Sequence, residues 1–146
     1  DINIELTETK PENKQAKIIP GVNIEKDPKV TVEANSEACW LFVKVEEAGT
    51  FVTDKVTYSI DTGWTKLTGV TGVDNVYYRE VGAVTADTDF AVLKDNKVTV
   101  SDTLTKEDIQ NITNPTLTFT AYAVQKDGID TVEAAWEKVS PSTTTP

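Results

Sequence analysis

Apolar and polar residues alternate along several segments of this chain, and two of these segments are long. They are residues 38–46 and 116–125. In the first, the apolar phase consists of Cys39, Leu41, Val43 and Val45. In the second, one phase consists of Leu117, Phe119, Ala121 and Ala123. Because successive side chains of a strand point to opposite faces, this period of two predicts strands that bury one face.

Shorter segments with the same period predict strands at residues 2–6, 30–34 and 56–60. Further short strands are predicted at residues 64–67, at residues 76–81 and around Val98 and Val100. Turns between them are indicated by Pro20-Gly21, Asp27-Pro28 and Asp61-Thr62-Gly63-Trp64. About seven or eight short strands with little helix predict an antiparallel β-sandwich of jelly-roll or immunoglobulin type.

Two short helices are predicted from capping patterns. Thr105 stands three residues before Asp108, and Asp130 stands three residues before Glu133. A cap residue followed three positions later by an acid has the form of a capping box. The second pattern leads into a segment with one apolar helical face, formed by Val132, Ala135, Trp136 and Val139. We therefore expect this helix, over residues 130–138, to cover an edge or an end of a sheet.

The length of 146 residues predicts one domain, which we place at residues 1–139. Residues 140–146 contain only serine, threonine and proline, and we expect a disordered tail or a linker there. The chain opens at Asp1 without an initiator methionine, which suggests a processed or trimmed protein. No apolar run approaches the roughly 20 residues that a membrane helix needs.

The net charge narrows the classes of partner. The sequence has 24 acidic and 14 basic residues and a formal net charge of −10. Nucleic acids and anionic membranes need a basic surface, so the charge argues against both partners. The acidic residues are spread along the chain, which predicts a well-solvated surface; cation binding and attraction to a basic partner are the alternatives.

The sequence lacks the residues of the common catalytic sites. It contains no histidine, which excludes a Ser-His-Asp triad, a Cys-His pair and an HExxH zinc site. We therefore predict no enzyme activity, no metal and no cofactor. The single cysteine, Cys39, lies on the buried phase of its strand, where it is expected to act as a small hydrophobic residue. An intermolecular disulfide or a reactive thiol is the alternative.

Carboxylates leave two further chemical possibilities open. A glycosidase needs a pair of them in a cleft, and no pair stands out among the 24 acids. Asp87-Thr88-Asp89, and Asp61 with Asp74, could offer oxygen ligands to calcium, but they lack the spacing of an EF-hand. We expect these residues to lie in solvated loops.

Trp40 and Phe42 lie on the strand phase opposite to Cys39. If that phase faced water, the two aromatic residues would form an exposed apolar patch, which is a candidate partner surface. The alternative is that the 130–138 helix or a loop covers them. Aromatic side chains that could stack against a sugar are Trp40, Trp64, Tyr77 and Tyr78.

The N-terminal third of the chain carries an ordered series of strand and turn motifs. They are Pro20-Gly21, Asp27-Pro28-Lys29-Val30-Thr31-Val32, Ser36-Glu37 and Leu41 to Val45. Later segments that fit the same series are residues 76–81 and 119–125. The series resembles that of the TasA/camelysin-like family of exported Gram-positive proteins. Camelysin itself is described as a metalloprotease, and we do not carry that activity over to a chain without histidine.

The resemblance implies a jelly-roll sandwich that assembles into extracellular fibres of the biofilm matrix. In such fibres an N-terminal strand of one subunit completes a sheet of the next. By position, the candidate donor strand here consists of Ile2, Ile4 and Leu6, and the polar residues 8–17 are the candidate connector. The alternative is that residues 2–6 complete their own sheet.

The sequence therefore supports two functional hypotheses. The first is a secreted structural protein at the cell surface or in the matrix, which associates with itself and with other matrix or cell-wall components. The second is an adhesin or a carbohydrate-binding β-sandwich module.

Overall fold

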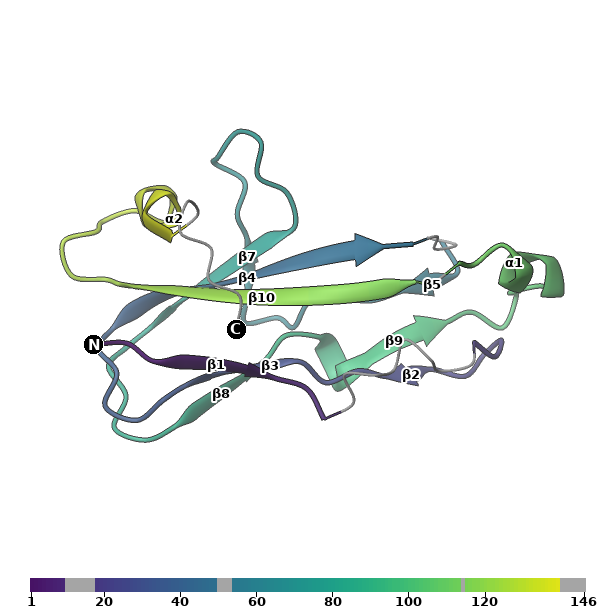
Figure 1. The fold of residues 1–146 in the computed structure, drawn as a ribbon, viewed down its shortest axis with the longest axis horizontal. Coiled ribbons are helices and arrows are strands. Elements are labelled where there is room, and N and C mark those ends of the chain that lie inside the picture. The colour runs from purple at the N-terminus through teal and green to yellow at the C-terminus, as the bar shows by residue number, and fades with distance from the viewer. Residues whose placement is uncertain (10–17, 50–53, 114, 140–146) are drawn as a thin grey trace.

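The computed structural model describes residues 1–9, 18–49, 54–113 and 115–139, and its fold is mainly antiparallel β with two short α-helices (Figure 1). The strands of the first half are β1 (Ile4–Thr7), β2 (Ile24–Glu25), β3 (Lys29–Val32), β4 (Cys39–Ala48), β5 (Val56–Thr57) and β6 (Thr65–Lys66). Those of the second half are β7 (Val76–Val81), β8 (Thr88–Ala91), β9 (Lys97–Val100) and β10 (Thr116–Gln125). The helices are α1 (Lys106–Gln110), α2 (Val132–Val139) and the 3-10 turn η2 (Lys94–Asn96).

The strands form three antiparallel sheets arranged in two layers. The strand order is β10-β4-β7-β6 in the largest sheet, β1-β3-β8 in the second and β2-β9-β5 in the third. Figure 1 shows β10, β4 and β7 in one layer, with β1, β3, β8, β2 and β9 in the facing layer. The long strands β4 and β10 pair over their full length, from Cys39 opposite Gln125 to Ala48 opposite Thr116.

The main core fills the space between the two layers. The apolar phase of β4 faces inward, where Cys39, Leu41 and Val43 are fully buried. Val30 and Val32 of β3 enter the same core from the facing layer, and both are also fully buried. The alternation in β4 thus predicts the inward phase correctly.

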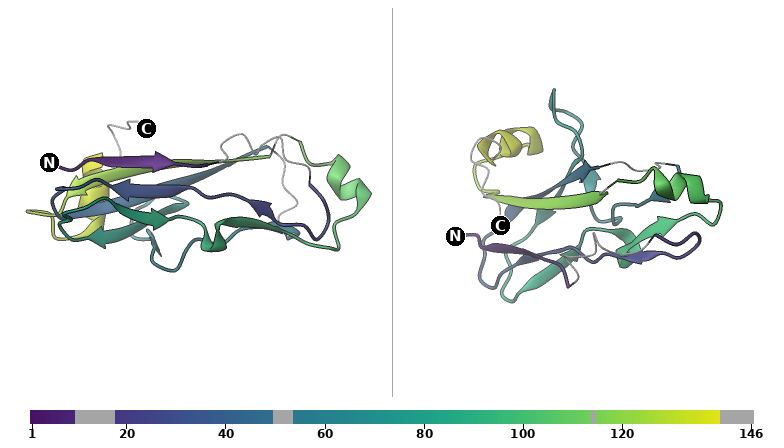
Figure 2. Two further views of the ribbon diagram at one scale, coloured as in Figure 1. Left: turned by 90° about the horizontal axis from the view of Figure 1, so that it is seen from below. Right: turned by 45° about the vertical axis from the view of Figure 1, so that its right-hand side comes forward.

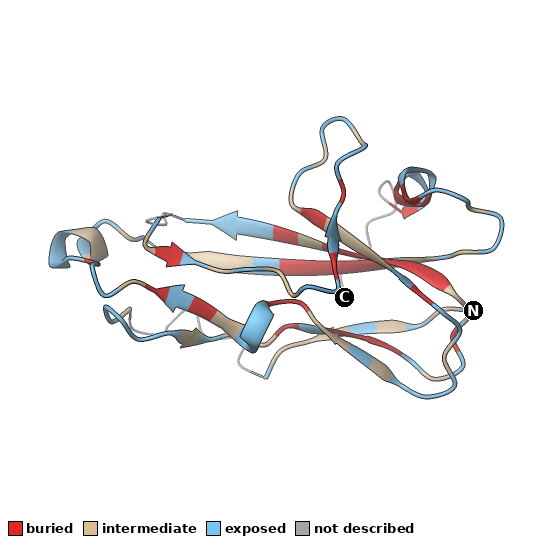
Figure 3. Ribbon diagram, turned by 180° about the vertical axis from the view of Figure 1, so that it is seen from behind, coloured by how far each residue is buried: buried red, intermediate tan, exposed pale blue. Residues whose placement is uncertain are grey.

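Helix α2 covers the outer face of the large sheet (Figures 1 and 3). The four apolar residues predicted to form one face of this helix, Val132, Ala135, Trp136 and Val139, are all buried. The ring of Trp136 meets Phe42 of β4 and Tyr122 of β10 edge-on, with centroids 5.2 and 5.3 Å apart. Both faces of β4 are therefore buried at this end of the molecule.

Helix α1 lies at the other end, beside a third small core of Val56, Val98, Val100 and Leu104. The predicted capping box is present, since the Thr105 hydroxyl accepts a hydrogen bond from the Asp108 N–H, and the Asp108 carboxylate accepts one from the Thr105 N–H. Neither α1 nor α2, nor any other helix in the described ranges, has the length and hydropathy to cross a membrane.

Several boundaries differ from the sequence-based predictions. In the segment predicted as a strand over residues 2–6, strand pairing begins at Ile4. In the segment predicted over residues 56–60, the strand covers only Val56–Thr57, and Ile60 forms an isolated bridge to Leu93. Two strands, β2 and β8, were not predicted. Both are short and gain their hydrogen bonds from distant partners, β9 and β3. Residues 140–146 and most of the predicted connector lie outside the described residues.

The start of α2 also differs by one residue. The side chain that caps the helix is Thr131, whose hydroxyl accepts a hydrogen bond from the Ala134 N–H at 3.2 Å, rather than Asp130. A cap satisfies the N–H group two or three residues later, so the helix that it starts covers Val132–Val139.

Candidate functional site

The candidate donor strand lies at an edge of the second sheet. Within the described residues β1 pairs with β3 alone, from Ile4 opposite Val32 to Thr7 opposite Lys29. The candidate donor side chains Ile2, Ile4 and Leu6 are half-buried and pack against the main core. In this structure residues 4–7 therefore complete their own sheet, and this is the arrangement that any strand exchange would have to replace.

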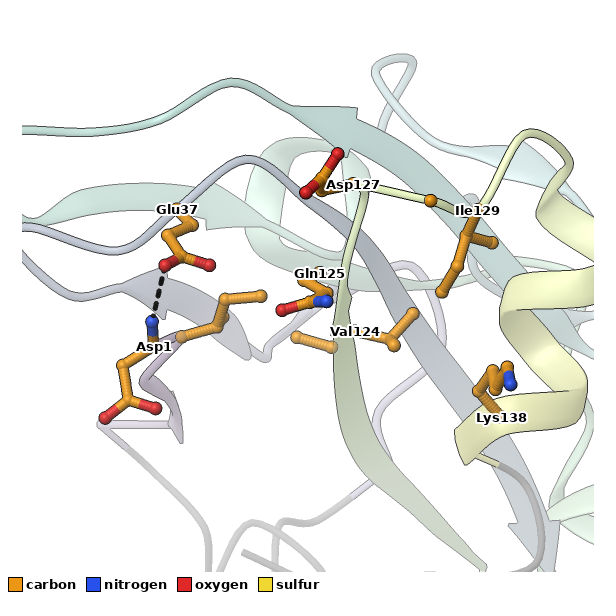
Figure 4. A pocket seen from close by; sticks show the side chains of 10 residues that line it. Asp1, Glu37, Val124, Gln125, Asp127, Ile129 and Lys138 are labelled. Atoms are coloured by element: carbon orange, nitrogen blue, oxygen red, sulfur yellow. Dashed lines mark ion pairs between the residues drawn. The ribbon is translucent and has the colours of Figure 1, made fainter.

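The N-terminal end of β1 is held mainly through its backbone. The Asn3 N–H donates to the buried Ser36 hydroxyl at 3.1 Å, and the Asn3 carbonyl accepts from the Glu33 N–H at 2.8 Å. The terminal amino group of Asp1 lies 3.0 Å from a Glu37 carboxylate oxygen, and both groups are exposed (Figure 4). Exposed pairs of this kind contribute little to stability.

The C-terminal end of β1 is held through side chains. The Lys26 ammonium lies 2.9 Å from the Glu8 carboxylate, and the two side chains are only 11% and 17% exposed. The same ammonium lies 5.7 Å from the centre of the Phe119 ring on β10. Thr9 donates both its N–H and its hydroxyl to the two carboxylate oxygens of Asp27. We call the Glu8–Lys26 and Thr9–Asp27 pairs the β1 end contacts.

Sequence reasoning missed the β1 end contacts, although one signal was present. Glu8 continues the inward phase of Ile2, Ile4 and Leu6, and its side chain is half-buried in the structure. A charged residue on an inward phase needs a partner of opposite charge. Nothing in the pattern of Lys26 and Asp27, which precede Pro28 in a turn signal, identified them as the partners of residues 8 and 9.

The contacts between the two layers differ between the two long sides of the molecule. β1 and β10 lie side by side along one side, but they do not pair with each other (Figure 2). A pocket of about 640 Å³ opens at the end of this side, between residues 1–2, the end of β10 with the turn that follows it, and Lys138 of α2 (Figure 4). Its lining combines apolar and charged side chains and holds no cluster of catalytic type.

On the opposite side, the one arginine of the sequence connects the two layers. Arg79 of β7 lies between the rings of Trp64 and Phe90, 5.1 and 4.2 Å from their centres. Since Phe90 belongs to β8, this stack joins the two layers, and the Trp64 indole N–H adds a 2.8 Å hydrogen bond to the Ala91 carbonyl. Burial lowers the pKa of Arg79, while the nearby Asp61 carboxylate acts in the opposite direction.

The candidate exposed aromatic surface is not exposed, so this prediction is wrong. Trp40 is 5% exposed and Phe42 is fully buried, because α2 and the segment before it cover them. The Trp40 indole N–H donates to the Ile129 carbonyl at 3.2 Å. The alternative expectation, that the C-terminal helix covers both residues, is confirmed.

The other candidate platforms for a sugar are partly or fully covered as well. Trp64 is buried at 6% exposure beneath Arg79. Tyr77 and Tyr78 are half-buried, and the Tyr78 ring meets Trp40 edge-on. No two of these four rings form an exposed platform, so the structure offers no observation in favour of the carbohydrate-binding hypothesis.

Three of the four carboxylates considered for calcium, those of Asp74, Asp87 and Asp89, contact protein groups, and the fourth, Asp61, lies near the Arg79 guanidinium. Asp89 lies on β8 and not in a loop, which corrects the prediction for that segment. Its carboxylate accepts a 2.6 Å hydrogen bond from Thr31 and pairs with Lys29, and these contacts lower its pKa. Asp87 accepts from the Ala34 N–H, and Asp74 lies 3.7 Å from Lys66. Within the described part of the chain, no three acidic, cysteine or histidine side chains gather as a metal site would require.

Cys39 is fully buried in the main core, as its strand phase predicts. Burial raises the pKa of its thiol to about 11. A thiol attacks as the thiolate, so this environment favours an inert group at neutral pH.

The comparisons with known proteins identify no relative. No protein-family model matches the chain, no curated protein has a similar sequence, and no solved structure is similar to this fold. The function of the protein therefore has to be inferred from its residues and their geometry.

Proposed function

We propose that this protein is a structural protein that associates with other copies of itself by exchanging β1. The observation that carries the proposal is the position of this strand. β1 is an edge strand that pairs, among the described residues, with β3 alone, and its apolar side chains are only half-buried. Such a strand can leave with a small loss of burial compared with a central strand.

The site that β1 leaves would accept an identical strand. Without β1, the edge of β3 would expose unpaired backbone groups and the apolar surface around Val30 and Val32. Exposed edges of this kind pair readily with a further strand. Because the same strand from a second copy restores the same contacts, exchange has a small net free-energy change and is decided by concentration.

The two sides of the molecule differ in a way that favours exchange at β1. On the far side, the Arg79 stack and the Trp64 hydrogen bond tie the layers together. On the near side, β1 and β10 lie next to each other without pairing, so that β1 can separate without breaking a ladder to β10.

We further propose that the sandwich is a jelly roll, that the copies form fibres outside the cell, and that the protein has no enzymatic activity. Extracellular fibres are supported by the strand and turn motifs of residues 20–45, which resemble those of the TasA/camelysin-like family. The absence of histidine from the sequence supports a structural role over a catalytic one.

Strand exchange can be tested with a disulfide that forms only between two chains. Thr7 and Lys29 face each other across β1 and β3. We expect Thr7→Cys chains, unfolded and refolded together with Lys29→Cys chains, to give a disulfide-linked heterodimer, because β1 of one copy then lies on β3 of the other. The chains are unfolded and refolded under reducing conditions, and the oxidant is added only after refolding, when the native Cys39 is buried again and does not interfere. The yield is measured by non-reducing electrophoresis and the linked peptides by mass spectrometry.

In the matched control, the acceptor cysteine is placed at an exposed residue that β1 does not reach. Lys66 is exposed on β6, away from β3. Thr7→Cys mixed with Lys66→Cys reports cross-linking by random collision. Equal yields from the two mixtures would show that β1 does not exchange, and the proposed function would be wrong.

A further inference from the structure

The apolar pattern of β1 does not by itself define how the strand aligns on β3. A slip of one residue turns every apolar side chain outward, so it is excluded. A slip of two residues keeps the apolar phase inward, because Ile2, Ile4 and Leu6 are all aliphatic and follow one another at this spacing. Something other than the apolar pattern must therefore select the alignment.

The contacts at the start of β1 do not distinguish the two alignments. Asn3 is held through its backbone N–H and carbonyl, which bind Ser36 and Glu33. Any residue except proline offers the same two groups. After a slip of two residues, another residue of the strand would supply them.

The β1 end contacts do distinguish them. The Glu8 carboxylate is the anionic partner of Lys26, whose side chain is only 11% exposed, and the Thr9 hydroxyl donates a hydrogen bond to the Asp27 carboxylate. With a slip of two residues, the sequence would bring Leu6 or Lys10 to the place of Glu8. The Lys26 ammonium would then face either an aliphatic side chain or a second positive charge, and a covered charge without its partner is strongly unfavourable.

Lys26 and Asp27 belong to the part of the chain that stays when β1 leaves. The Lys26 N–H donates to the Asn96 carbonyl at 2.8 Å, next to β9. The Lys26 ammonium also remains near the Phe119 ring of β10. Glu8 and Thr9, in contrast, follow β1 directly and would move with it.

We propose that Lys26 and Asp27 form a recognition site for the end of β1 from a second copy of this chain. The site accepts a strand in which the inward apolar residues are followed by a carboxylate and then a hydroxyl, and it thereby selects both the sequence and the alignment of the incoming strand. This inference rests on the proposed strand exchange and adds the side chains that make it specific.

The test combines charge reversal with the disulfide between Thr7→Cys donors and Lys29→Cys acceptors. A donor that also carries Glu8→Lys should give about tenfold less heterodimer with an unmodified acceptor, because two ammonium groups then meet. The yield should return when the acceptor carries Lys26→Glu, which restores a pair of opposite charge. The matched control is a donor with Glu5→Lys, which has the same net charge but an outward-facing, exposed side chain, and its yield should stay within about twofold.

The outcomes separate the two proposals. If the unmodified donor and acceptor give no heterodimer above the collision control, strand exchange itself is wrong. If they do, and Glu8→Lys donors are captured as well as unmodified ones, the recognition site is wrong while strand exchange stands. Failure of Lys26→Glu to restore the yield also overturns the recognition site. If Glu8→Lys chains do not fold, Glu8→Gln donors are used instead. Their yield of heterodimer with acceptors that retain Lys26 must be lower than that of donors that retain Glu8.

Discussion

Arg79 shows how much a single side chain can organise in this fold. It is the one arginine of the sequence, and its guanidinium lies between two aromatic rings that belong to different layers. The planar guanidinium suits stacking on ring faces, which a lysine ammonium cannot reproduce. The close approach of Gly63 completes this arrangement, because a side chain there would enter the space of Arg79.

Gly63→Ala should therefore destabilise the protein. A Cβ at this position would lie 2.5 Å from an Arg79 terminal nitrogen, and the flanking rings limit how far the guanidinium can move. We expect a loss of about 1–3 kcal/mol in the free energy of unfolding, measured by urea denaturation. Gly82→Ala is the matched control, since a Cβ there would meet no atom within 4 Å. Equal stability of the two variants would show that Arg79 moves aside freely.

The buried thiol gives a second prediction at this scale. Cys39 is fully buried, and its pKa is raised to about 11, so little thiolate forms at neutral pH. We expect a thiol reagent to label the native protein slowly and the urea-unfolded protein rapidly and stoichiometrically. Fast labelling of the folded chain would mean that the core around Cys39 opens far more often than its packing suggests.

At the scale of the elements, one carboxylate, that of Asp108, makes two contacts that hold α1 in place. Asp108 completes the capping box with Thr105, and its carboxylate lies 2.9 Å from the ammonium of Lys55, the residue before β5. The Lys55 hydrogen bond, together with those from Thr105, lowers the pKa of Asp108 to about 2. This side chain therefore ties the helix to the third core.

The depressed pKa determines how α1 responds to acid. Because the folded state holds Asp108 ionised below its usual value of 3.8, the stabilisation is fully present above that pH and is lost as the pH falls towards 2. We expect an Asp108→Asn variant to have a lower free energy of unfolding than the unmodified protein at neutral pH. The difference should shrink as the pH falls towards 2, where the unmodified protein loses the same stabilisation. Urea denaturation from pH 2 to 7 measures both free energies. Glu107→Gln, at an exposed position of the same turn, is the control and should retain the profile of the unmodified protein. Identical pH profiles for Asp108→Asn and the unmodified chain would contradict this account.

At the scale of the whole molecule, the proposed assembly has to overcome a net charge of −10, which makes copies repel one another. Strand exchange can do so because it restores main-chain hydrogen bonds and the burial of Ile2, Ile4 and Leu6 in each copy. The exchanged strand brings only a small part of the two surfaces into contact. Salt screens the repulsion between the other charges beyond about 8–10 Å.

Deletion of residues 1–7 tests the role of β1 in the proposed fibres. The truncated chain keeps the β4–β10 ladder, the fully buried core residues of β3 and β4, and the α2 contacts, so we expect it to stay folded by circular dichroism. It should form no fibres in electron micrographs, because it has no strand to donate. Two results would falsify the donor role: fibres that persist after the deletion, or a truncated chain that is unfolded.

Much of the fold follows from local patterns in the sequence. Alternation alone locates β4 and β10 and identifies the inward phase of β4, because a strand with one buried face must repeat every two residues. The Thr105–Asp108 capping box and the apolar face of α2 are equally local, since each depends on residues within two helical turns. The inert position of Cys39 follows from the same alternation.

The remaining features depend on contacts between distant segments. Alternation shows that one face of β4 is buried, but only the docking of α2, some 90 residues later, decides that Trp40 and Phe42 are buried too. β2 has only two residues and the four residues of β8 do not alternate, so both strands form because β9 and β3 offer them hydrogen bonds. The candidate site has the same origin. The sequence by itself marks Ile2, Ile4 and Leu6 as a strand, whereas the tertiary structure places that strand at an edge and brings Lys26 to Glu8, because a charge on an inward phase is stable only where the fold supplies its partner.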